Sequence, residues 1–433
     1  MGTGARVRLG VDLAPLRASG AFRRLYLAGF VSMLGDQATF VTAPFQLRDL
    51  THSTVAVGAL GLVELVPLVA FGLWGGALAD RVDRRRLVVA TEVVVALATV
   101  ALFGNALAAR PTVVVLYVFA GLVAAAQSLQ APSLAALDQV LVAHDLQRSA
   151  ATLSTLAGTV ASILGPALGG LAAVVWGPRV VYGATLVTVG ATFVLLASVR
   201  LAPAVRRGTG GGDGDLAALR EAARYARRRP DVTGTYVVDL LAMVLAYPVT
   251  MVPFVAARFP DRYALALLYV GLPLGALLAT VTSRWTRRVH HYGRAVVASA
   301  ALWGLGVALF GVARSLPLAL AGLVVGGAGD AVSGIFRQTL WNESIAPEVR
   351  GRMAGLEMIS YSLGPTAGQF RAGAMAAWVG LRASLALGGV ACTGSVVAVA
   401  GALPALWRFD ARADPEVERV RALRASGGTE PVL

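Results

Sequence analysis

The fold class is clearest at one point of the sequence, where the apolar stretch VAVGALGLVELVPLVAFGLW (residues 55–74) is followed directly by GGALADRVDRRR (75–86). The first segment holds one acid and no base, whereas the second holds two aspartates and four arginines. A core helix of a soluble protein has no reason to end at so abrupt a change in polarity, but a helix that leaves a lipid bilayer does. The sequence therefore predicts a transmembrane helix that ends in a headgroup layer.

The rest of the chain has the same character. It is 57% hydrophobic and 14% charged, whereas soluble proteins carry about 25% charged residues. Because every backbone polar group in lipid needs a partner within its own segment, long apolar runs must be helices. The sequence predicts an all-α membrane protein with twelve transmembrane helices, at about 22–47, 54–79, 87–108, 112–137, 149–175, 179–199, 232–257, 263–283, 294–313, 316–341, 353–378 and 382–407.

The arginines predict the orientation of these helices. All 38 basic residues are arginine, and a cytoplasmic N-terminus places 29 of them inside, seven outside and two, Arg337 and Arg371, within spans. The positive-inside rule then predicts a multi-pass protein of the inner (plasma) membrane with both termini in the cytoplasm. The formal net charge of +14 faces the anionic lipid leaflet, so we expect the bilayer, and no nucleic acid, as the partner of this charge.

The chain divides into two similar halves. The longest polar interruption, 200–231, separates six spans from six, and Gly165-Pro166 recurs 199 residues later as Gly364-Pro365. Such duplication is common in secondary transporters, whose substrate sites lie near the midplane between the repeats. We predict two pseudo-symmetric six-helix bundles (1–200 and 232–410), a cytoplasmic linker with a short surface helix (201–231) and a cytoplasmic tail (411–433).

Two motifs resemble those of a known family. Between spans two and three, the run Gly76-Ala-Leu-Ala-Asp80-Arg81-Val-Asp-Arg84-Arg85 resembles the G-x-L-a-D-R-x-G-R-R/K motif of the major facilitator superfamily, with an aspartate where the family usually has glycine. In span five, Gly165-Pro166-Ala-Leu-Gly169-Gly170 is similar to the antiporter motif of exporters in that superfamily.

Finer features resemble the enterobactin-exporter branch of this superfamily. They are AFRRLYLAGFVSMLGDQ (21–37), GLPLGALLA (271–279) and RGRMAGL (350–356). The resemblance implies the major facilitator fold and a monomeric secondary transporter. It also implies proton-coupled antiport, with export of a siderophore or a multidrug-like small molecule by alternating access and no cofactor besides the proton gradient. By the same resemblance, Asp80 approaches the start of span eleven and closes a cytoplasmic gate.

The acids inside predicted spans include Asp36, Glu64, Asp239 and Asp330. Ionisable residues inside a membrane are costly and usually functional. Asp36 and Glu64 lie roughly 16 and 15 Å from the outer ends of consecutive spans, at about 1.5 Å per residue. If they face each other, one of them holds a proton more readily because like charges repel. The resemblance also makes Asp36, Asp239 and Asp330 cavity residues. We expect proton coupling first at Asp36, then at Glu64, Asp330 and Asp239.

Span ten also holds Arg337, seven residues after Asp330 and closer in depth to Glu357 of span eleven. We expect a structural Arg337–Glu357 ion pair. Seven residues correspond to about 10.5 Å along a helix, which leaves Asp330 less tied to the arginine.

Other function classes fit the sequence less well. A facilitator or importer of the same fold remains open, as does a non-transporting membrane sensor or scaffold, although the latter predicts fewer acids at the midplane. An ATP-driven pump needs the lysine of a Walker A motif, and the chain has no lysine. The sequence offers no metal-ligand cluster and no catalytic triad, so we expect neither an enzyme nor a metal protein.

Overall fold

The computed structural model describes residues 12–81, 84–143, 146–197, 224–345 and 347–425, and these residues form helices and connecting segments. The first half contains α1 (Ala14–Ala18), α2 (Gly20–Thr51), α3 (Thr54–Arg81), α4 (Arg84–Leu107), α5 (Val113–Leu141), α6 (Gln147–Trp176) and α7 (Pro178–Ala197). The second half contains α9 (Pro230–Ala246), η3 (Val249–Met251), α10 (Val252–Ala256), α11 (Ala264–Val281), η4 (Ser283–Arg288), α12 (Tyr292–Val312), α13 (Leu316–Ser344), α14 (Pro347–Val379), α15 (Leu381–Ala402), α16 (Pro404–Arg408) and α17 (Pro415–Ala425).

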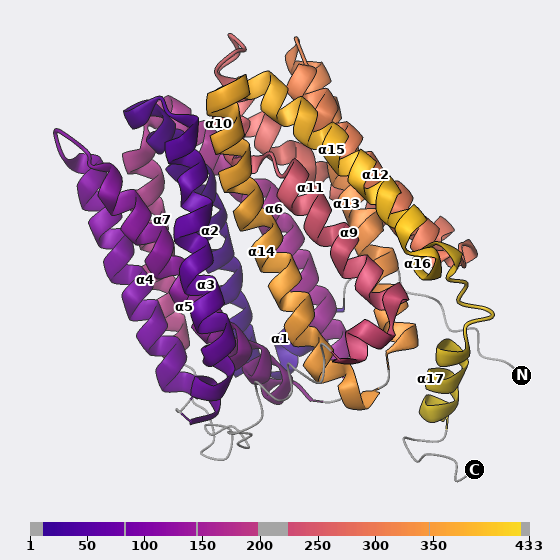
Figure 1. Cartoon of the computed structure of the whole chain (residues 1–433). Helices are drawn as coiled ribbons and strands as arrows, with labels where there is room; N and C mark the ends of the chain where they lie inside the picture. Colours follow the sequence, from indigo (N-terminus) through magenta and orange to yellow (C-terminus); the bar gives the residue numbers. More distant parts are fainter. Residues whose placement is uncertain (1–11, 82–83, 144–145, 198–223, 346, 426–433) are drawn as a thin grey trace, which may run out of the picture.

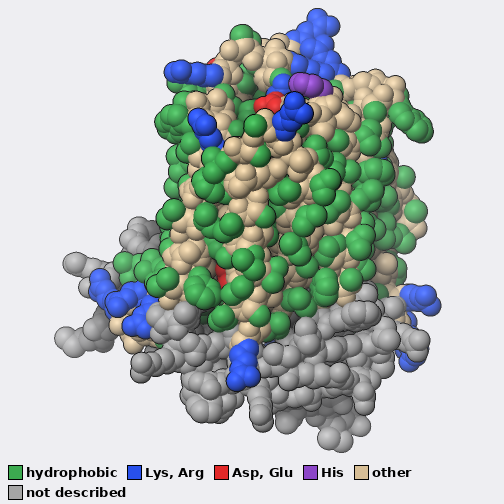
Figure 2. Space-filling model, turned by 90° about the vertical axis from the view of Figure 1, so that its left-hand side faces the viewer, with side chains coloured by type: hydrophobic (Ala, Val, Ile, Leu, Met, Phe, Trp, Pro, Cys, Tyr) green, Lys and Arg blue, Asp and Glu red, His purple; other side chains and the backbone are tan. Residues whose placement is uncertain are grey.

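Within the described residues, ten helical segments are long and apolar enough to cross a membrane. The helices α2 and α14 are longer still, at 32 and 33 residues, but several charged residues lower their hydropathy. Both run among the other long helices (Figure 1). Hydrophobic side chains cover the middle of the surface in Figure 2, and arginines lie at its upper and lower rims. Such a band is what a bilayer requires. The chain is a multi-pass membrane protein.

The long helices contact one another mainly within each half. The helix α2 packs against α6 and α7, and α4 packs against α5 and α7, whereas α12 packs against α13 and α15, and α9 against α14. In Figure 1 the helices α2, α3, α4, α5 and α7 lie on one side, and α11, α12, α13 and α15 on the other. The linker helix predicted within 201–231 falls largely on residues 198–223, which lie outside the described ranges.

The two halves touch at the end of the molecule remote from α1 and α17 (Figure 1). There α3 contacts α14, and α6 contacts α11, with α14 crossing beside α3 in Figure 1. Three glycines form the α3–α14 contact, which we call the glycine seam: Gly58, Gly61 and Gly373. A Cβ at Gly58 would lie 2.9 Å from the Gln369 carbonyl oxygen and 3.0 Å from the Gly373 Cα. Only glycine permits this approach of two backbones.

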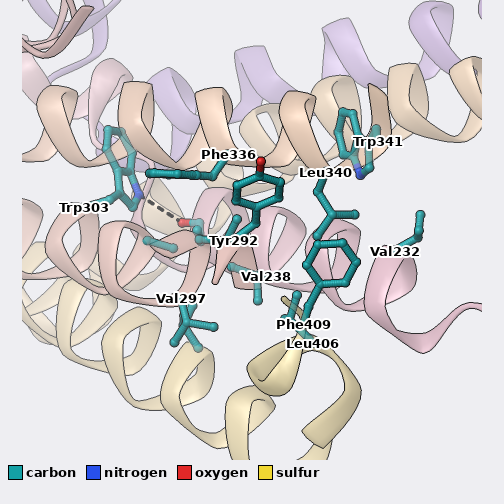
Figure 3. Packing of buried hydrophobic residues seen from close by; sticks show 14 of the residues in the cluster. Val232, Val238, Tyr292, Val297, Trp303, Phe336, Leu340, Trp341, Leu406 and Phe409 are labelled. Atoms are coloured by element: carbon teal, nitrogen blue, oxygen red, sulfur yellow. Dashed lines mark hydrogen bonds between the residues drawn. The ribbon is translucent and has the colours of Figure 1, made fainter. Parts of the chain in front are cut away.

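The second half has a well-packed apolar core between its helices. Figure 3 shows Phe336 of α13 near Tyr292 of α12, with Phe409 beside Tyr292; the ring centroids of the two pairs are each 5.9 Å apart. The indole Nε1 of Trp303 donates to the carbonyl oxygen of Ala242 at 3.3 Å, the dashed line in Figure 3. Offset aromatic pairs and satisfied indoles fix the relative positions of these helices.

The first helix of the second half is interrupted where proline removes a donor. Because Pro248 has no N–H, the carbonyl oxygen of Val244 has no partner four residues on, and α9 ends at Ala246. The Nε of Arg371 donates to that Val244 oxygen at 3.2 Å. The chain then continues through η3 and α10, which brings Thr250 to the junction of the two halves.

The C-terminal segment packs against the near ends of α9 and α13. Val417 and Val420 of α17 are fully buried, and Nη2 of Arg421 lies 3.2 Å from Oε2 of Glu343. Arg229, which precedes α9, binds Asp231 with a closest N–O distance of 2.6 Å and donates to the carbonyl oxygen of Ser344 at 2.9 Å. Part of the predicted tail is therefore a docked helix.

Candidate functional site

A cavity of about 370 Å³ lies at the junction of the two halves. Most of its wall comes from α2, α3 and α5, while η3 and α14 of the second half each contribute one residue. Its size is that of a site for a drug-sized molecule. The lining residues are Asp36, Gln37, Thr39, Phe40, Ala43, Pro44, Leu60, Glu64, Leu68, Phe119, Ala120, Val123, Ala124, Gln127, Ser128, Thr250 and Gln369.

The structure brings Asp36 of α2 and Glu64 of α3 together as the two charged residues of this lining. Ser32, one turn before Asp36, lies near the Asp36 carboxyl group. Among the described side chains, no arginine or histidine lies within ion-pair distance of Asp36 or Glu64. A carboxyl group in this position can become neutral by taking up a proton, or can bind a cation from the cavity.

A third acid, Glu92 of α4, lies nearby and was not among the predicted site residues. Its side chain is buried, lies near Gln130 of α5 and is close enough to Asp36 for the two charges to interact. Glu92 is only about five residues from the predicted start of span three. Its position along the predicted span therefore places it in the headgroup region. The sequence feature that could have identified Glu92 as a buried acid is its position as the one charged residue in the apolar run LVVATEVVVALATV (87–100).

Two polar atoms from the second half complete the cavity. Oγ1 of Thr250 and Oε1 of Gln369 are buried and have no hydrogen-bond partner within the described part of the chain. The two residues are 1% and 3% exposed, and both line the cavity. Because an unpaired buried polar atom costs about 1–3 kcal/mol, these atoms favour a bound group that can donate hydrogen bonds.

Asp239 and Arg337 form a separate, buried ion pair. Nη1 of Arg337 contacts Oδ1 of Asp239, and both side chains are 3% exposed. The hydroxyl of Ser360 donates to Oδ2 of Asp239 at 3.0 Å. Asp330 lies at the edge of this pair, with Oδ1 4.0 Å from Nη2 of Arg337 and a side chain that is 43% exposed. Neither Asp239 nor Asp330 belongs to the cavity lining, contrary to the expectation from the resemblance.

The predicted Arg337–Glu357 ion pair is wrong. Arg337 lies on the face of α13 that looks toward α9, so Asp239 is its partner. The neighbouring Gln338 lies about 100° further around the helix and faces α14, where its Nε2 donates to Oε1 of Glu357 at 2.7 Å. The similar membrane depth of Arg337 and Glu357 suggested the pairing, but the helix face on which Arg337 lies determines its partner.

The two family motifs lie at different places. The motif residues Gly76, Asp80, Arg81, Arg84 and Arg85 fall at the end of α3 and the start of α4, and their side chains lie outside the described ones, so the gate stays a prediction. The motif of α6 packs against α2 beside the cavity. A Cβ at Gly165 would lie 2.5 Å from Cβ of Gln37, and a Cβ at Gly169 would lie 2.6 Å from Cα of Ala38.

These glycines therefore bring α6 into backbone contact with the turn of α2 that follows Asp36. Pro166 lies inside α6 between them and is buried, and Gly170 faces α11, where its Cβ would lie 3.2 Å from Cα of Ala266. The motif positions the cavity wall and one contact between the halves.

The profile of a family described as transmembrane secretion effector matches residues 11–421. The chain belongs to this family. Among curated relatives, the enterobactin exporters EntS of Salmonella typhi and of Escherichia coli O1:K1 / APEC are each 26% identical to it, over 80% of this chain and 83% of theirs.

Solved structures show the same fold. The nucleoside transporter NupG superposes with a TM-score of 0.70 at 13% identity and covers 90% of this chain and 100% of its own. A bacterial homologue of the human lysosomal transporter Spinster, in an inward-facing and unoccupied conformation, gives a TM-score of 0.65 at 16% identity and covers 90% and 96%. The chain therefore has the major facilitator fold. Its membership of the secretion-effector family and its likeness to exporters make it a membrane transporter.

Proposed function

We propose that this protein is a proton-coupled exporter that moves a siderophore or another drug-like molecule by alternating access. One observation carries the proposal: Asp36 and Glu64 line a cavity between the two halves, and no described basic side chain neutralises them. Asp239, in contrast, is held by Arg337.

The physical basis is the high energy of a bare charge in a membrane interior. A carboxyl group that faces a cavity at membrane depth is stable when it carries a proton or when a cation lies beside it. Proton binding and release at Asp36 or Glu64 therefore change the energy of the state that encloses the cavity. A ligand shifts a conformational equilibrium only by its difference in affinity between the two states, and a titrating acid in the cavity supplies such a difference.

The contacts between the halves support alternating access. Among the described residues, the main ones join α3 with α14, α6 with α11, and the short η3 and α10 with α3 and α2. Each half packs much more extensively within itself. A rocking motion would therefore break the glycine seam and the apolar contacts that Val41, Val57 and Leu60 make with the second half. The core around Trp303 and Phe336 lies within the second half and would stay intact, as transporters of this architecture require.

Transport in inverted membrane vesicles tests the proposal. Vesicles with this protein should accumulate a fluorescent drug-like probe when an inward-acid pH gradient is applied, and nigericin, which collapses that gradient, should abolish accumulation. The variants Asp36→Asn and Glu64→Gln should lower the pH-driven uptake at least tenfold. Asp261→Asn, which changes an exposed loop acid, is the matched control and should transport normally.

Two outcomes would contradict proton coupling. Uptake that survives nigericin would indicate a facilitator of the same fold. Asp36→Asn and Glu64→Gln variants that both keep the full response to the pH gradient would show that neither acid couples transport to protons.

A further inference from the structure

The charged groups of the cavity all have one sign. Asp36 and Glu64 are acidic, and the described lining contains no arginine or histidine; the chain contains no lysine at all. An anionic cargo would face two carboxyl groups here without any cation to receive it. A positively charged cargo would find both of its counterions in place.

Two buried arginines of the second half, Arg337 and Arg371, bind other groups, although Nη2 of Arg371 has no hydrogen-bond partner among the described residues. Arg337 is bound to Asp239 and lies 4.0 Å from Asp330. Arg371 donates from Nε to the carbonyl oxygen of Val244 at 3.2 Å and from Nη1 to that of Ser384 at 3.3 Å. Neither arginine belongs to the cavity lining.

The uncharged part of the wall also fits a cation. Phe40 of α2 and Phe119 of α5 line the cavity, and aromatic faces attract ammonium groups. The Oε1 atom of Gln369 is a buried acceptor without a partner, and the Thr250 hydroxyl, which can donate or accept, also has none among the described residues. They are independent of the two acids, come from the other half of the molecule, and call for N–H or O–H donors on the ligand.

We infer that the cargo is a drug-sized organic cation with at least one N–H donor, a protonated amine, whose ammonium group lies between Asp36 and Glu64 and donates to Gln369. This inference rests on the proposed transport function and names its substrate class. It sets this cavity apart from one built for an anionic siderophore. The ammonium group and the coupling protons then compete for the same two carboxyl groups, and the aromatic body of the cargo packs against Phe40 and Phe119.

Equilibrium binding to the purified full-length protein in lipid nanodiscs tests the inference without any gradient. Three probes share one aromatic body: 2-(1-naphthyl)ethylamine, its N-acetyl amide and 3-(1-naphthyl)propanoate. By isothermal titration at pH 7.5 the amine, protonated at this pH, should bind at least tenfold more tightly than the neutral amide. The propanoate should bind more weakly still.

Variants assign the binding to the cavity. Glu64→Gln and Asp36→Asn keep the side-chain shapes and should each weaken amine binding at least tenfold, while binding of the amide changes less than threefold. Gln369→Leu should weaken amine binding about threefold to tenfold, because an acceptor is lost, and Asp261→Asn should bind like the wild type. Glu64→Asp, which retains the charge, should restore most of the affinity and so separates a charge effect from a folding defect.

Several results would overturn the inference: equal affinity for amine and amide, tighter binding of the propanoate, or unchanged amine affinity in the Glu64→Gln and Asp36→Asn variants. Failure of this inference and failure of the transport proposal give different results. Amine binding without pH-driven transport would contradict the exporter and leave the site standing. Export of an anionic siderophore by a protein that fails to bind the amine would contradict the substrate class alone.

Discussion

A methyl group added within the glycine seam should separate the two halves at the end remote from α1 and α17. The seam exists only while α3 and α14 are in contact, so any steric penalty applies to this conformation alone. A Cβ at Gly61 would lie 2.8 Å from Cβ of Gln369 and closer still to the carbonyl oxygen of Thr366. That oxygen belongs to a helix backbone and cannot rotate away.

The size of the effect follows from the overlap. Overpacking of a close contact costs about 1–3 kcal/mol, and each 1.4 kcal/mol is a factor of ten in population. Gly61→Ala should therefore shift the equilibrium away from the closed seam by roughly 5- to 150-fold. Gly104→Ala is the matched control, because a Cβ at Gly104 of α4 would meet no atom within 4 Å.

Pulsed electron–electron spin resonance measures this shift directly. The one cysteine, Cys392, is buried and can be replaced by alanine. Spin labels then attach at Val55→Cys and Trp378→Cys, two exposed positions beside the seam. Gly61→Ala should move most of the distance distribution to longer values, whereas Gly104→Ala should leave it unchanged. A Gly61→Ala distribution that matches that of the parent protein would refute the seam as the contact that closes this end.

Two further predictions concern stability. Asp239→Asn leaves the buried Arg337 with only Asp330 at 4.0 Å, so we expect a loss of about 3 kcal/mol, seen as a lower melting temperature in detergent than that of Asp261→Asn. The double variant Asp239→Asn/Arg337→Met should melt closer to the wild type, and a lower melting temperature for the double variant would contradict an ion pair. Arg229→Gln removes the donor to the Ser344 carbonyl oxygen. Trypsin should then cleave α17 several-fold faster in this variant than in the exposed control Arg228→Gln. Equal cleavage rates in the two variants would contradict the anchoring role of Arg229.

The sequence predicts the helices well because the membrane imposes a simple rule on them. The spans expected at 263–283 and 294–313 correspond to α11 at Ala264–Val281 and α12 at Tyr292–Val312. Long apolar runs have no alternative to helix in lipid. The segment at 232–257 is the exception, because Pro248 divides it into α9, η3 and α10.

The internal repeat also has a structural counterpart. A Cβ at Gly165 of α6 would press on Gln37 of α2, and one at Gly364 of α14 would press on Met243 of α9, at 2.5 and 2.7 Å between the Cβ atoms. The two Gly-Pro pairs therefore occupy the fifth long helix of each half, and each glycine packs against the first helix of its own half. The repeat spacing of the two Gly-Pro pairs could be recognised in the sequence because both pairs form the equivalent contact, between the fifth and the first long helix of their half.

The site was only partly predictable, because depth along a helix says nothing about which way a side chain points. Equal depth correctly suggested that Asp36 and Glu64 share a region. The same reasoning paired Arg337 with Glu357, where helix rotation in fact selects Asp239. Thr250 and Gln369 do not stand out in the sequence, because ordinary polar residues become part of a site only when helices from both halves converge. Glu92 does stand out in its apolar run, but its position near the predicted start of span three placed it in the headgroup region.

Proton release during cargo entry reports whether cargo and protons compete for Asp36 and Glu64. Proteoliposomes that contain a trapped pH-sensitive dye and the purified protein are mixed with 2-(1-naphthyl)ethylamine in the presence of valinomycin and potassium, which hold the membrane potential at zero. The account predicts carrier-dependent proton efflux that saturates with amine concentration. It also predicts loss of this efflux in the double variant Asp36→Asn/Glu64→Gln and its retention in Asp261→Asn. Saturable proton efflux of wild-type size from the double variant would contradict it.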